Sequence, residues 1–524
     1  MLKIKKIISV LSCLAMVLIS PGLPAEAKNA EDLRNADIAE LAAQPKFDAR
    51  EYGIVTPVRD QGDTSLCWAY STASASETSI LRSGIDKSVN VRTAFLSPLQ
   101  IGYARHNRGA DPLGNTNGEK NDKAVDWRME TGAARIAATM LSSWCGPVKT
   151  NVAYNANGWE NAAYKLESAI AVDGSRLNTD ASAREKMKRA IVKYGAVTFS
   201  YNNVRNAYYY NPNGETGSVS SPHACTIIGW DDTIPAGSFS PGGTTTDGGW
   251  LVKNSYSSLP YFYLSYEVTS EAIYAFEYVM NDKYDYNYFY DSSVEKDGIG
   301  VLWNVKQAAN VFEAKGGDEN TSEWIKAVNV GIIGKNTECT VKIYTDVPDK
   351  DFDPQNAMPA AEKKMQFDYA GFNCVELDEP VEVKKGSRFA AVASVTNKTN
   401  DASIAIGENV SPNSFICKSY WTAMPAAVRI KVFTKTAEKS KNTAVEFVDK
   451  NTVKVSGTGA KQLILAKYEN ERLQDLRIIP IDIHTGEKTI PLPSEWKKTE
   501  RTGYKAFLWN SLSDIVPECP AAAE

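Results

Sequence analysis

The spacing of apolar residues changes along this chain of 524 residues, and the change limits the folds that the chain can adopt. Stretches with helical character come first and strand-like stretches follow. The helices are expected at 66–81, 133–143 and 183–194, and the strands at 224–230, 250–255 and 261–268. Helices followed by strands, rather than the two in alternation, predict an α+β domain with two unlike halves over residues 47–280.

Beyond residue 280 the pattern is that of strands alone. Short strand-like runs separated by turns rich in Gly, Asn, Asp and Pro fill residues 284–435, which predicts an all-β, sandwich-like module able to fold as an independent unit. A polar linker at 435–442 leads to a second, smaller β module at 443–515. The chain is therefore expected to hold one α+β domain and two β modules.

The N-terminus has the layout of an export signal. Three lysines precede an apolar run at 7–19, and Ala25-Glu26-Ala27 offers a small-x-small cleavage site, so residues 1–27 are interpreted as a signal peptide. The apolar run is too short to span a bilayer, and no later run reaches about 18 apolar residues. The mature chain is therefore expected outside the cell, secreted or attached to the cell surface, without a membrane span.

Composition and motifs exclude several classes of protein. Lys plus Arg number 58 and Asp plus Glu number 63, giving a net charge of −5 with no basic run, so a nucleic acid is not expected as partner. The sequence contains no CxxC pair, HExxH, P-loop or GxGxxG motif, which argues against zinc, nucleotide and dinucleotide sites. Neither a cofactor nor a metal is expected.

Three dispersed residues suggest thiol chemistry. A Gly-containing polar loop delivers Cys67 to the start of an apolar helix, where the positive end of the helix dipole favours the thiolate. His223 begins an apolar strand and Asn254 ends another. A cysteine, a histidine and an asparagine form the thiol version of a nucleophile, a base and a residue that orients the base.

These residues lie in segments that resemble the papain-like cysteine peptidases. The segments are Asp60-Gln61-Gly62, Cys67-Trp-Ala-Tyr-Ser71, His223-Ala224 and Lys253-Asn-Ser-Tyr256. The resemblance covers about 47–270 and implies a two-lobed catalytic domain, with a helical lobe and a β-barrel lobe. Together with the signal peptide and the β modules, the chain resembles a bacterial branch of this family in which a lectin-like β domain, here 284–435, follows the peptidase.

The resemblance also implies the roles of individual residues. Cys67 would attack the scissile carbonyl, His223 would pair with the thiol and protonate the leaving amine, and Asn254 would orient the imidazole. Gln61 would donate a side-chain N–H to the oxyanion. Further positions of the substrate cleft would be Gly132, Pro222, Ala224 and Tyr256, the last replacing a tryptophan that shields the histidine–asparagine bond in the family.

Two departures from the family pattern affect the expected regulation. Thr64 stands where the family usually has a cysteine that forms a disulfide. The segment between the signal peptide and the catalytic domain, residues 28–46, is much shorter than the inhibitory prosegments of many relatives. A segment of this size buries little area, so we do not expect it to hold the enzyme silent.

The sequence therefore predicts a secreted cysteine endopeptidase that hydrolyses peptide bonds of protein or peptide substrates through a thioester acyl-enzyme. A glycan or cell-surface polymer is a further expected partner, bound through 284–435. Two alternatives remain open. One is a surface adhesin or carbohydrate-binding protein with a peptidase-like scaffold, and the other is a transpeptidase that uses the same thiol chemistry.

Overall fold

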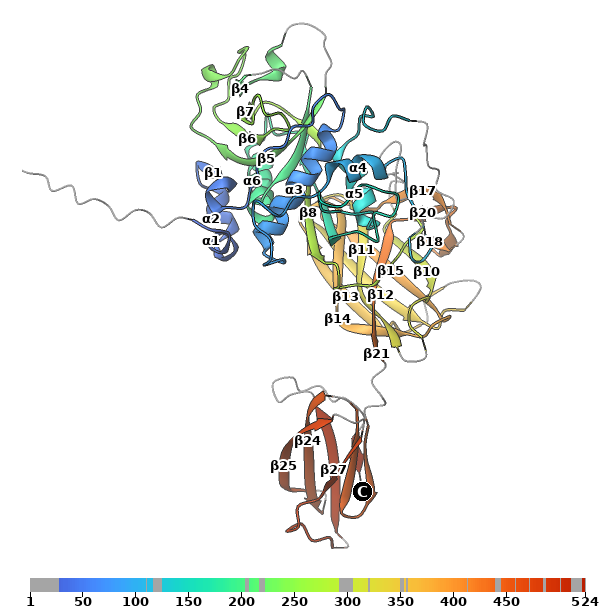
Figure 1. The fold of residues 1–524 in the computed structure, drawn as a ribbon. Coiled ribbons are helices and arrows are strands. Elements are labelled where there is room, and N and C mark those ends of the chain that lie inside the picture. Colours follow the sequence, from blue (N-terminus) through green and yellow to red (C-terminus); the bar gives the residue numbers. More distant parts are fainter. Residues whose placement is uncertain are drawn as a thin grey trace, which may run out of the picture.

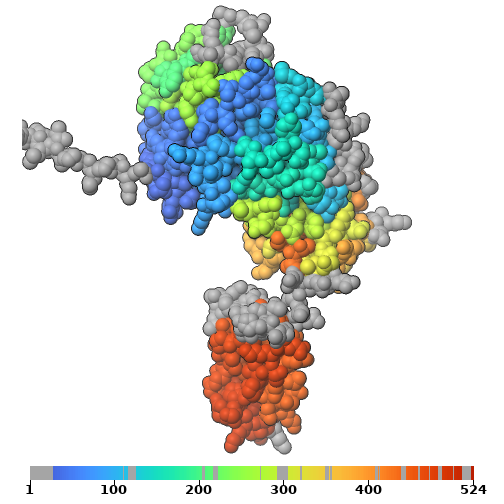
Figure 2. All heavy atoms as spheres, viewed as in Figure 1, coloured from blue at the N-terminus to red at the C-terminus, as the bar shows by residue number. Residues whose placement is uncertain are grey.

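The computed structural model consists of a mixed helical and β part, a β-sandwich and a C-terminal β module (Figures 1 and 2). It describes residues 28–109, 111–115, 125–202, 207–215, 222–291, 305–318, 321–348, 353–354, 357–411, 413–438, 444–457, 459–470, 472–483, 487–499, 501–509 and 521–523. The predicted signal peptide at 1–27 lies outside these ranges. Among the described residues no helix has the length and apolar character needed to cross a membrane.

The helices lie in the first part of the chain, as the sequence predicts. The long helix α3 is buried along most of its length and ends at Gly84, whose left-handed φ of 68° suits a residue without Cβ. The helices are α1 (Ala30–Asn35), α2 (Ile38–Ala42), α3 (Cys67–Ser83), α4 (Pro98–Ala104), α5 (Ala134–Ser142) and α6 (Ala181–Tyr194). Helices α1 and α2 pack against α3 and α6, with Leu33 fully buried.

The predicted β lobe is a six-stranded sheet in the order β1-β5-β6-β7-β4, with β3 paired to β5. Its strands are β1 (Lys46–Asp48), β3 (Val197–Tyr201), β4 (Tyr209–Tyr210), β5 (His223–Asp231), β6 (Gly249–Lys253) and β7 (Tyr261–Ser265). Strand β5 is buried at every position because it lies in the middle of the sheet and also packs against α3. This central position fixes the residue at its start, His223, inside the domain.

The β-sandwich extends beyond the bounds 284–435 expected for it, because one of its sheets takes in strands from an earlier part of the chain. One of its sheets has the order β8-β2-β14-β11-β21-β9, with β16 paired to β11, and β2 and β8 come from the segment predicted as the catalytic domain. Strand β14 pairs with β2 through residues 370–372, where a Cβ on Gly371 would lie 2.3 Å from the carbonyl oxygen of Ala169. The strands are β2 (Tyr164–Gly174), β8 (Ser270–Met280), β9 (Tyr286–Tyr288), β11 (Thr321–Ile333), β14 (Ala370–Val383), β16 (Ser403–Ile404) and β21 (Ile430–Glu438).

A second sheet completes the sandwich in the order β13-β12-β15-β10-β18-β19. Residues of both sheets share one hydrophobic core, for example Val328 of β11 and Val341 of β12. The strands are β10 (Gln307–Glu313), β12 (Thr337–Thr345), β13 (Ala361–Phe367), β15 (Arg388–Thr396), β18 (Ser414–Cys417) and β19 (Trp421–Ala423), with β17 (Ile406–Val410) and β20 (Ala426–Val428) paired beside them.

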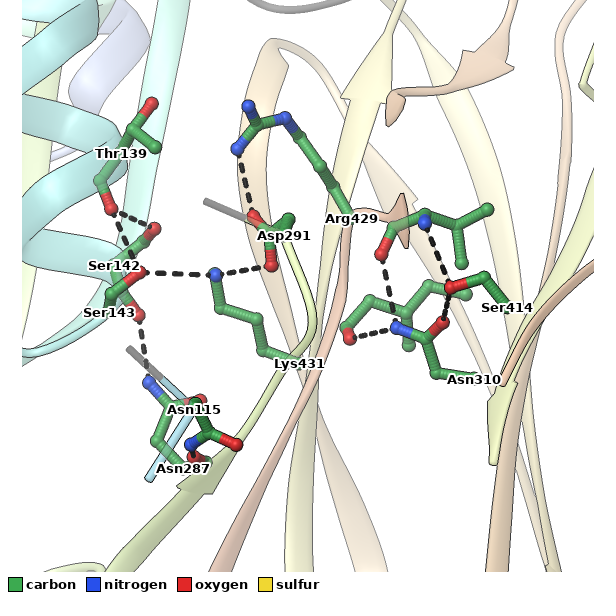
Figure 3. A network of polar contacts seen from close by, with 12 residues as sticks. Asn115, Thr139, Ser142, Ser143, Asn287, Asp291, Asn310, Ser414, Arg429 and Lys431 are labelled. Carbon is green, nitrogen blue, oxygen red and sulfur yellow. Dashed lines mark hydrogen bonds and ion pairs between the residues drawn. The ribbon is translucent and has the colours of Figure 1, made fainter. Parts of the chain in front are cut away.

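Three charged residues, called here the junction cluster, lie where the sandwich meets helix α5 (Figure 3). Asp291, Arg429 and Lys431 are each fully buried. The carboxylate of Asp291 accepts hydrogen bonds from Arg429 at 2.9 Å and from Lys431 at 2.7 Å. Lys431 also donates to the hydroxyl of Ser143, at the end of α5. Close by, the amide of Asn287 donates to the carbonyl of residue 142, so polar contacts tie the two parts together.

The C-terminal module has a hydrophobic core of its own, which includes Val453, Leu465 and Trp496. Its described strands form two sheets, one in the order β22-β23-β26 and one in the order β25-β24-β27-β28. They are β22 (Ala444–Asp449), β23 (Thr452–Ser456), β24 (Gly459–Glu469), β25 (Arg472–Ile483), β26 (Glu487–Pro491), β27 (Thr502–Trp509) and β28 (Ala522–Ala523).

Candidate active site

A cleft of about 680 Å³ lies between the helical lobe and the β lobe. Cys67 at the start of α3 and His223 at the start of β5 both line it, although they are far apart in the sequence. The remaining walls come from residues 131–135 before and within α5, from the end of β3, and from residues 268–271 at the start of β8. The cleft is therefore formed by several helices and strands, each of which begins or ends at it.

Helix α3 is fixed against strand β5, and this contact sets the position of Cys67 relative to His223. The hydroxyl of Ser71 donates to the carbonyl of Cys225 at 2.5 Å, and the hydroxyl of Thr226 donates to the carbonyl of Ser71 at 3.2 Å. Both bonds are buried and lie about one turn from the thiol. If the helix moved relative to the strand, these two hydrogen bonds would break where water cannot replace them, which costs free energy.

Two opposing effects act on the thiol of Cys67. Burial raises its pKa above the ordinary value of 9.0, while the backbone N–H groups of Ala224, Trp68 and Cys67 itself lower it. Burial is the larger effect. The position at the helix start thus supplies N–H donors to the sulfur. These donors alone do not lower the pKa of Cys67 enough to give the thiolate that the sequence predicts, so a charged partner is needed.

The imidazole of His223 is held by Asn254. The ring Nε2 lies 2.9 Å from Oδ1 of Asn254, and only 3% and 9% of the two residues is exposed. The Nδ2 of Asn254 donates to the carbonyl of Leu259 at 3.0 Å, so its oxygen must face the ring. The Nε2 atom therefore carries a hydrogen, and Nδ1 is the nitrogen that can exchange a proton with a thiol.

Two tyrosines enclose the same imidazole. The ring of Tyr256 stacks on His223 with centroids 5.5 Å apart and planes at 22°, and Tyr201 meets it edge-on at 5.7 Å and 89°. This enclosure buries the imidazole, and burial lowers the pKa of His223 while the hydrogen bond with Asn254 opposes the shift. Tyr256 thus covers the histidine, as the family resemblance implies for this position, but it is not among the residues that line the cleft.

Gln61 is held next to this arrangement rather than in the cleft lining. Its backbone N–H donates to the carbonyl of Ser255 at 2.9 Å, and its Oε1 accepts from the Ser255 hydroxyl at 2.7 Å. Its Nε2 donates to the carbonyl of Thr64 at 2.6 Å. An amide nitrogen carries two hydrogens, so one remains for a further acceptor.

The other predicted cleft positions lie together. Gly132, Pro222 and Ala224 all line the cleft. Gly132 packs against the indole of Trp68, where a Cβ would come within 2.3 Å of Cε2 of that ring. A glycine is needed here so that the backbone can pass over the side chain that follows Cys67.

Sequence reasoning missed other residues of the site. Arg135, Tyr201 and Glu271 also line the cleft, yet nothing in their local sequence distinguishes them from neighbouring residues. Beneath the site, the fully buried carboxylate of Glu77 binds Arg59 and the hydroxyl of Thr56. A glutamate on the buried face of an Ala- and Ser-rich helix was the signal that could have revealed this cluster, because buried carboxylates are paired.

The buried amine of Lys253 belongs to the same cluster. Its Nζ donates to the Thr56 hydroxyl at 2.8 Å, and burial lowers its pKa to about 8. Lys253 immediately precedes Asn254, so this bond helps to fix the strand end that carries the asparagine. Among the described residues no group of three or more His, Cys, Asp or Glu side chains could hold a metal ion.

Comparisons with known proteins give matches for both the mixed helical and β part and the β-sandwich. The chain matches the family described as papain family cysteine protease over residues 43–259 and the lectin like domain over residues 287–420. Cysteine proteinase 15A of Pisum sativum is 24% identical over 243 residues, which is 45% of this chain and 58% of that protein. Cathepsin R of Mus musculus is 25% identical over 225 residues, covering 40% and 56%. The chain thus spans less than two thirds of the length of these relatives.

A solved structure shares the two-part architecture. The cysteine protease and lectin-like domains of Cwp84, a surface layer associated protein of Clostridium difficile, align with a TM-score of 0.58 and 21% identity over 78% of this chain and 95% of that chain. Cwp84 after propeptide cleavage gives a TM-score of 0.56 and 20% identity, covering 75% and 99%. At this identity the likeness establishes the fold of both parts and not a shared substrate.

Proposed function

Because residues 43–259 are a papain family cysteine protease domain and residues 287–420 a lectin-like domain, we propose that the chain is a secreted cysteine endopeptidase that acts through a thioester. The observation that carries this proposal is the cleft that Cys67 and His223 line together, with Asn254 bonded to the imidazole from behind. The likeness to the Cwp84 domains supports an extracellular setting, as does the predicted signal peptide.

The proposed reaction uses these residues in two stages. Nδ1 of His223 takes the proton of Cys67, the sulfur attacks the substrate carbonyl, and the imidazolium then protonates the leaving amine. The product is a thioester between Cys67 and the acyl part of the substrate. His223 next takes a proton from water, the hydroxide adds to the thioester, and the thiol leaves with that proton.

The developing oxyanion needs donors that are in place before the reaction. We assign this role to the backbone N–H of Cys67 and to the second hydrogen on Nε2 of Gln61. Ser255 and Thr64 hold the Gln61 amide in a single orientation. Gln61 is 5% exposed, so the bond to an oxyanion would form in a site that excludes water and would be strong for this reason.

The N-terminal segment does not block the proposed cleft. Among the described residues none from 28–46 lines it, and Leu33 instead packs into the domain core. Arg82 on α3 donates to the carbonyl of Leu33, and Arg34 donates to the carbonyl of Arg82. We therefore propose that residues 28–46 stabilise the fold and that the enzyme needs no trimming for activity.

Purified protein beginning at Lys28 tests both statements. Given a reductant, it should cleave a fluorogenic peptide at once, whereas the Cys67→Ala variant should not. Added amines separate hydrolysis from acyl transfer, since a transpeptidase would yield the amine adduct as its main product. Activity that appears only after proteolysis near Phe47 would show that the segment is an inhibitor.

For the lectin-like domain we propose binding of a glycan or cell-surface polymer. Because its sheet continues into β2 and β8, binding should be measured on the full chain carrying Cys67→Ala, which prevents self-digestion. Retention of the full chain on a glycan array or on purified cell-wall polymer is the expected result. Failure to bind any of them would leave the domain as a structural support for the peptidase.

A further inference from the structure

One arginine in the cleft has no acceptor among the described residues. Arg135 is the second residue of α5, is half-buried, and lines the cleft together with Cys67 and His223. Within the ranges of the chain that the structure describes, its guanidinium makes neither a hydrogen bond nor an ion pair. A half-buried guanidinium keeps its N–H donors available, so this side chain can bind an acceptor that enters the cleft as part of a ligand.

Neighbouring arginines differ from Arg135 in this respect. Arg59 is paired with Glu77, and Arg105 donates to the carbonyl of Thr131. Arg128 donates to the hydroxyl of Tyr154 at 2.8 Å. Each of these three side chains is bonded within the fold, whereas Arg135 lines the cleft and its guanidinium bonds to none of the described residues.

The surroundings of Arg135 favour an anion. Burial lowers the pKa of the Arg105 guanidinium, Glu130 opposes this shift, and the positive charge of Arg135 adds to it, so two cations lie near each other at this end of the cleft. Glu215 and Glu271 line the same cleft, but neither is within ion-pair distance of Arg135. A carboxylate from outside the protein would relieve the repulsion between the two arginines.

We propose that Arg135 binds the carboxylate of an acidic substrate side chain, so that the enzyme prefers Asp or Glu at one position near the scissile bond. This inference rests on the proposed peptidase function. The planar guanidinium can donate two parallel N–H bonds to a carboxylate, which gives geometric selectivity as well as attraction. An uncharged side chain of the same shape, such as Gln, leaves these donors unsatisfied and is disfavoured.

The test compares peptides that differ only in Glu or Gln at one position, moved through the residues on both sides of the cleaved bond. With the reduced full chain, kcat/KM should be about 10- to 100-fold higher for Glu than for Gln at one position, as expected for a bond to a charged group. Arg135→Met should bring this ratio close to one, and Arg135→Glu should reverse the preference towards Lys. Arg128→Met, which removes a nearby arginine that does not line the cleft, should keep the ratio.

Three results would overturn the inference. One is a wild-type ratio near one at every position, and another is a ratio that survives in Arg135→Met. The third is a requirement for a free C-terminal carboxylate in place of an acidic side chain. Absence of cleavage of every peptide by the wild type would overturn the proposed peptidase function as well, so the two failures can be told apart.

Discussion

Two groups of buried polar side chains in this molecule are each assembled from distant parts of the sequence, but their surroundings differ. The first is the proposed catalytic set, Cys67, His223 and Asn254, called here the catalytic set. The second is the junction cluster, Asp291, Arg429 and Lys431. Each group brings together strands or helices that are distant in sequence. The catalytic set opens on a cleft of about 680 Å³, whereas the members of the junction cluster are 0% exposed. Access to substrate, not burial or polarity, distinguishes the two.

The difference shows how the same kind of interaction can serve chemistry or assembly. In the catalytic set, burial raises the pKa of Cys67 and lowers that of His223, so each group resists carrying a charge alone. The proposed reaction therefore requires that a proton pass from the thiol to the imidazole. In the junction cluster the carboxylate of Asp291 faces two cations at 2.9 and 2.7 Å, so the charges are fixed and support the contact between the two parts.

The largest expected effect is the difference in kcat/KM between variants of Cys67 and of Cys225. Cys67→Ala should reduce kcat/KM by more than about 10⁴-fold, because the nucleophile is lost while the fold is kept. Cys225→Ala is the matched control, since that thiol lies on the neighbouring strand but is buried in the core. It should retain most activity in the same peptide assay. Near wild-type turnover by Cys67→Ala would remove the basis of the peptidase assignment.

A smaller difference should appear within the catalytic set. His223→Ala should lower kcat by about 10³-fold, because this residue moves protons in both stages. Asn254→Ala should lower it by about 10- to 100-fold, since it only orients the ring. Circular dichroism on both variants checks that the fold is intact. Equal losses would mean that Asn254 does more than orient the imidazole.

A substitution in the junction cluster should lower the free energy of unfolding and leave kcat nearly unchanged. Asp291→Asn removes the negative charge that two buried cations share and should destabilise the chain by about 3 kcal/mol in urea unfolding. The kcat of the folded protein should stay within a factor of about three. The control is Asp173→Asn, which breaks the exposed pair with Lys335 across the same junction and should cost less than about 1 kcal/mol. Equal costs for the two variants would contradict the account of the buried cluster.

The smallest expected effect is on the reactivity of the Cys67 thiol when His223 is removed. Burial raises the pKa of Cys67 above 9.0, so in His223→Ala the thiolate fraction at pH 7 should be below about 1%. Alkylation of Cys67 by iodoacetamide should then rise with pH and level off only above pH 9, as followed by mass spectrometry. A plateau that begins below pH 7 in this variant would show that the helix start alone produces the thiolate.

Local patterns in the sequence account for much of the fold. The start of α3 at Cys67 and the strands that carry His223 and Asn254 follow from apolar runs bounded by polar loops. Pairing of β2 with β14 could not be predicted, because it joins residues 169–171 to 370–372 across most of two domains. Independent folding of 284–435 stays a prediction, and the sheet shared with β2 and β8 is the feature that argues against it.

The site was predictable where residue type and order carry the chemistry. Cys67, His223 and the cleft positions Gly132, Pro222 and Ala224 could be named from short motifs, and the structure brings them to one cleft. Their catalytic roles remain predictions. Arg135 could not be singled out, because a charged residue in a helix is usually solvated and only the three-dimensional surroundings show what it faces.

The most direct test of the account is the position at which a thiol-reactive epoxide modifies the reduced protein. Incubation of the full chain at neutral pH, digestion and mass mapping should give one adduct, on Cys67, with loss of peptide hydrolysis in proportion to labelling. His223→Ala should label far more slowly under the same conditions, because the thiolate is then scarce. Labelling at another cysteine, or full labelling of Cys67 without loss of hydrolysis, would contradict the claim that this thiol in this cleft is the nucleophile.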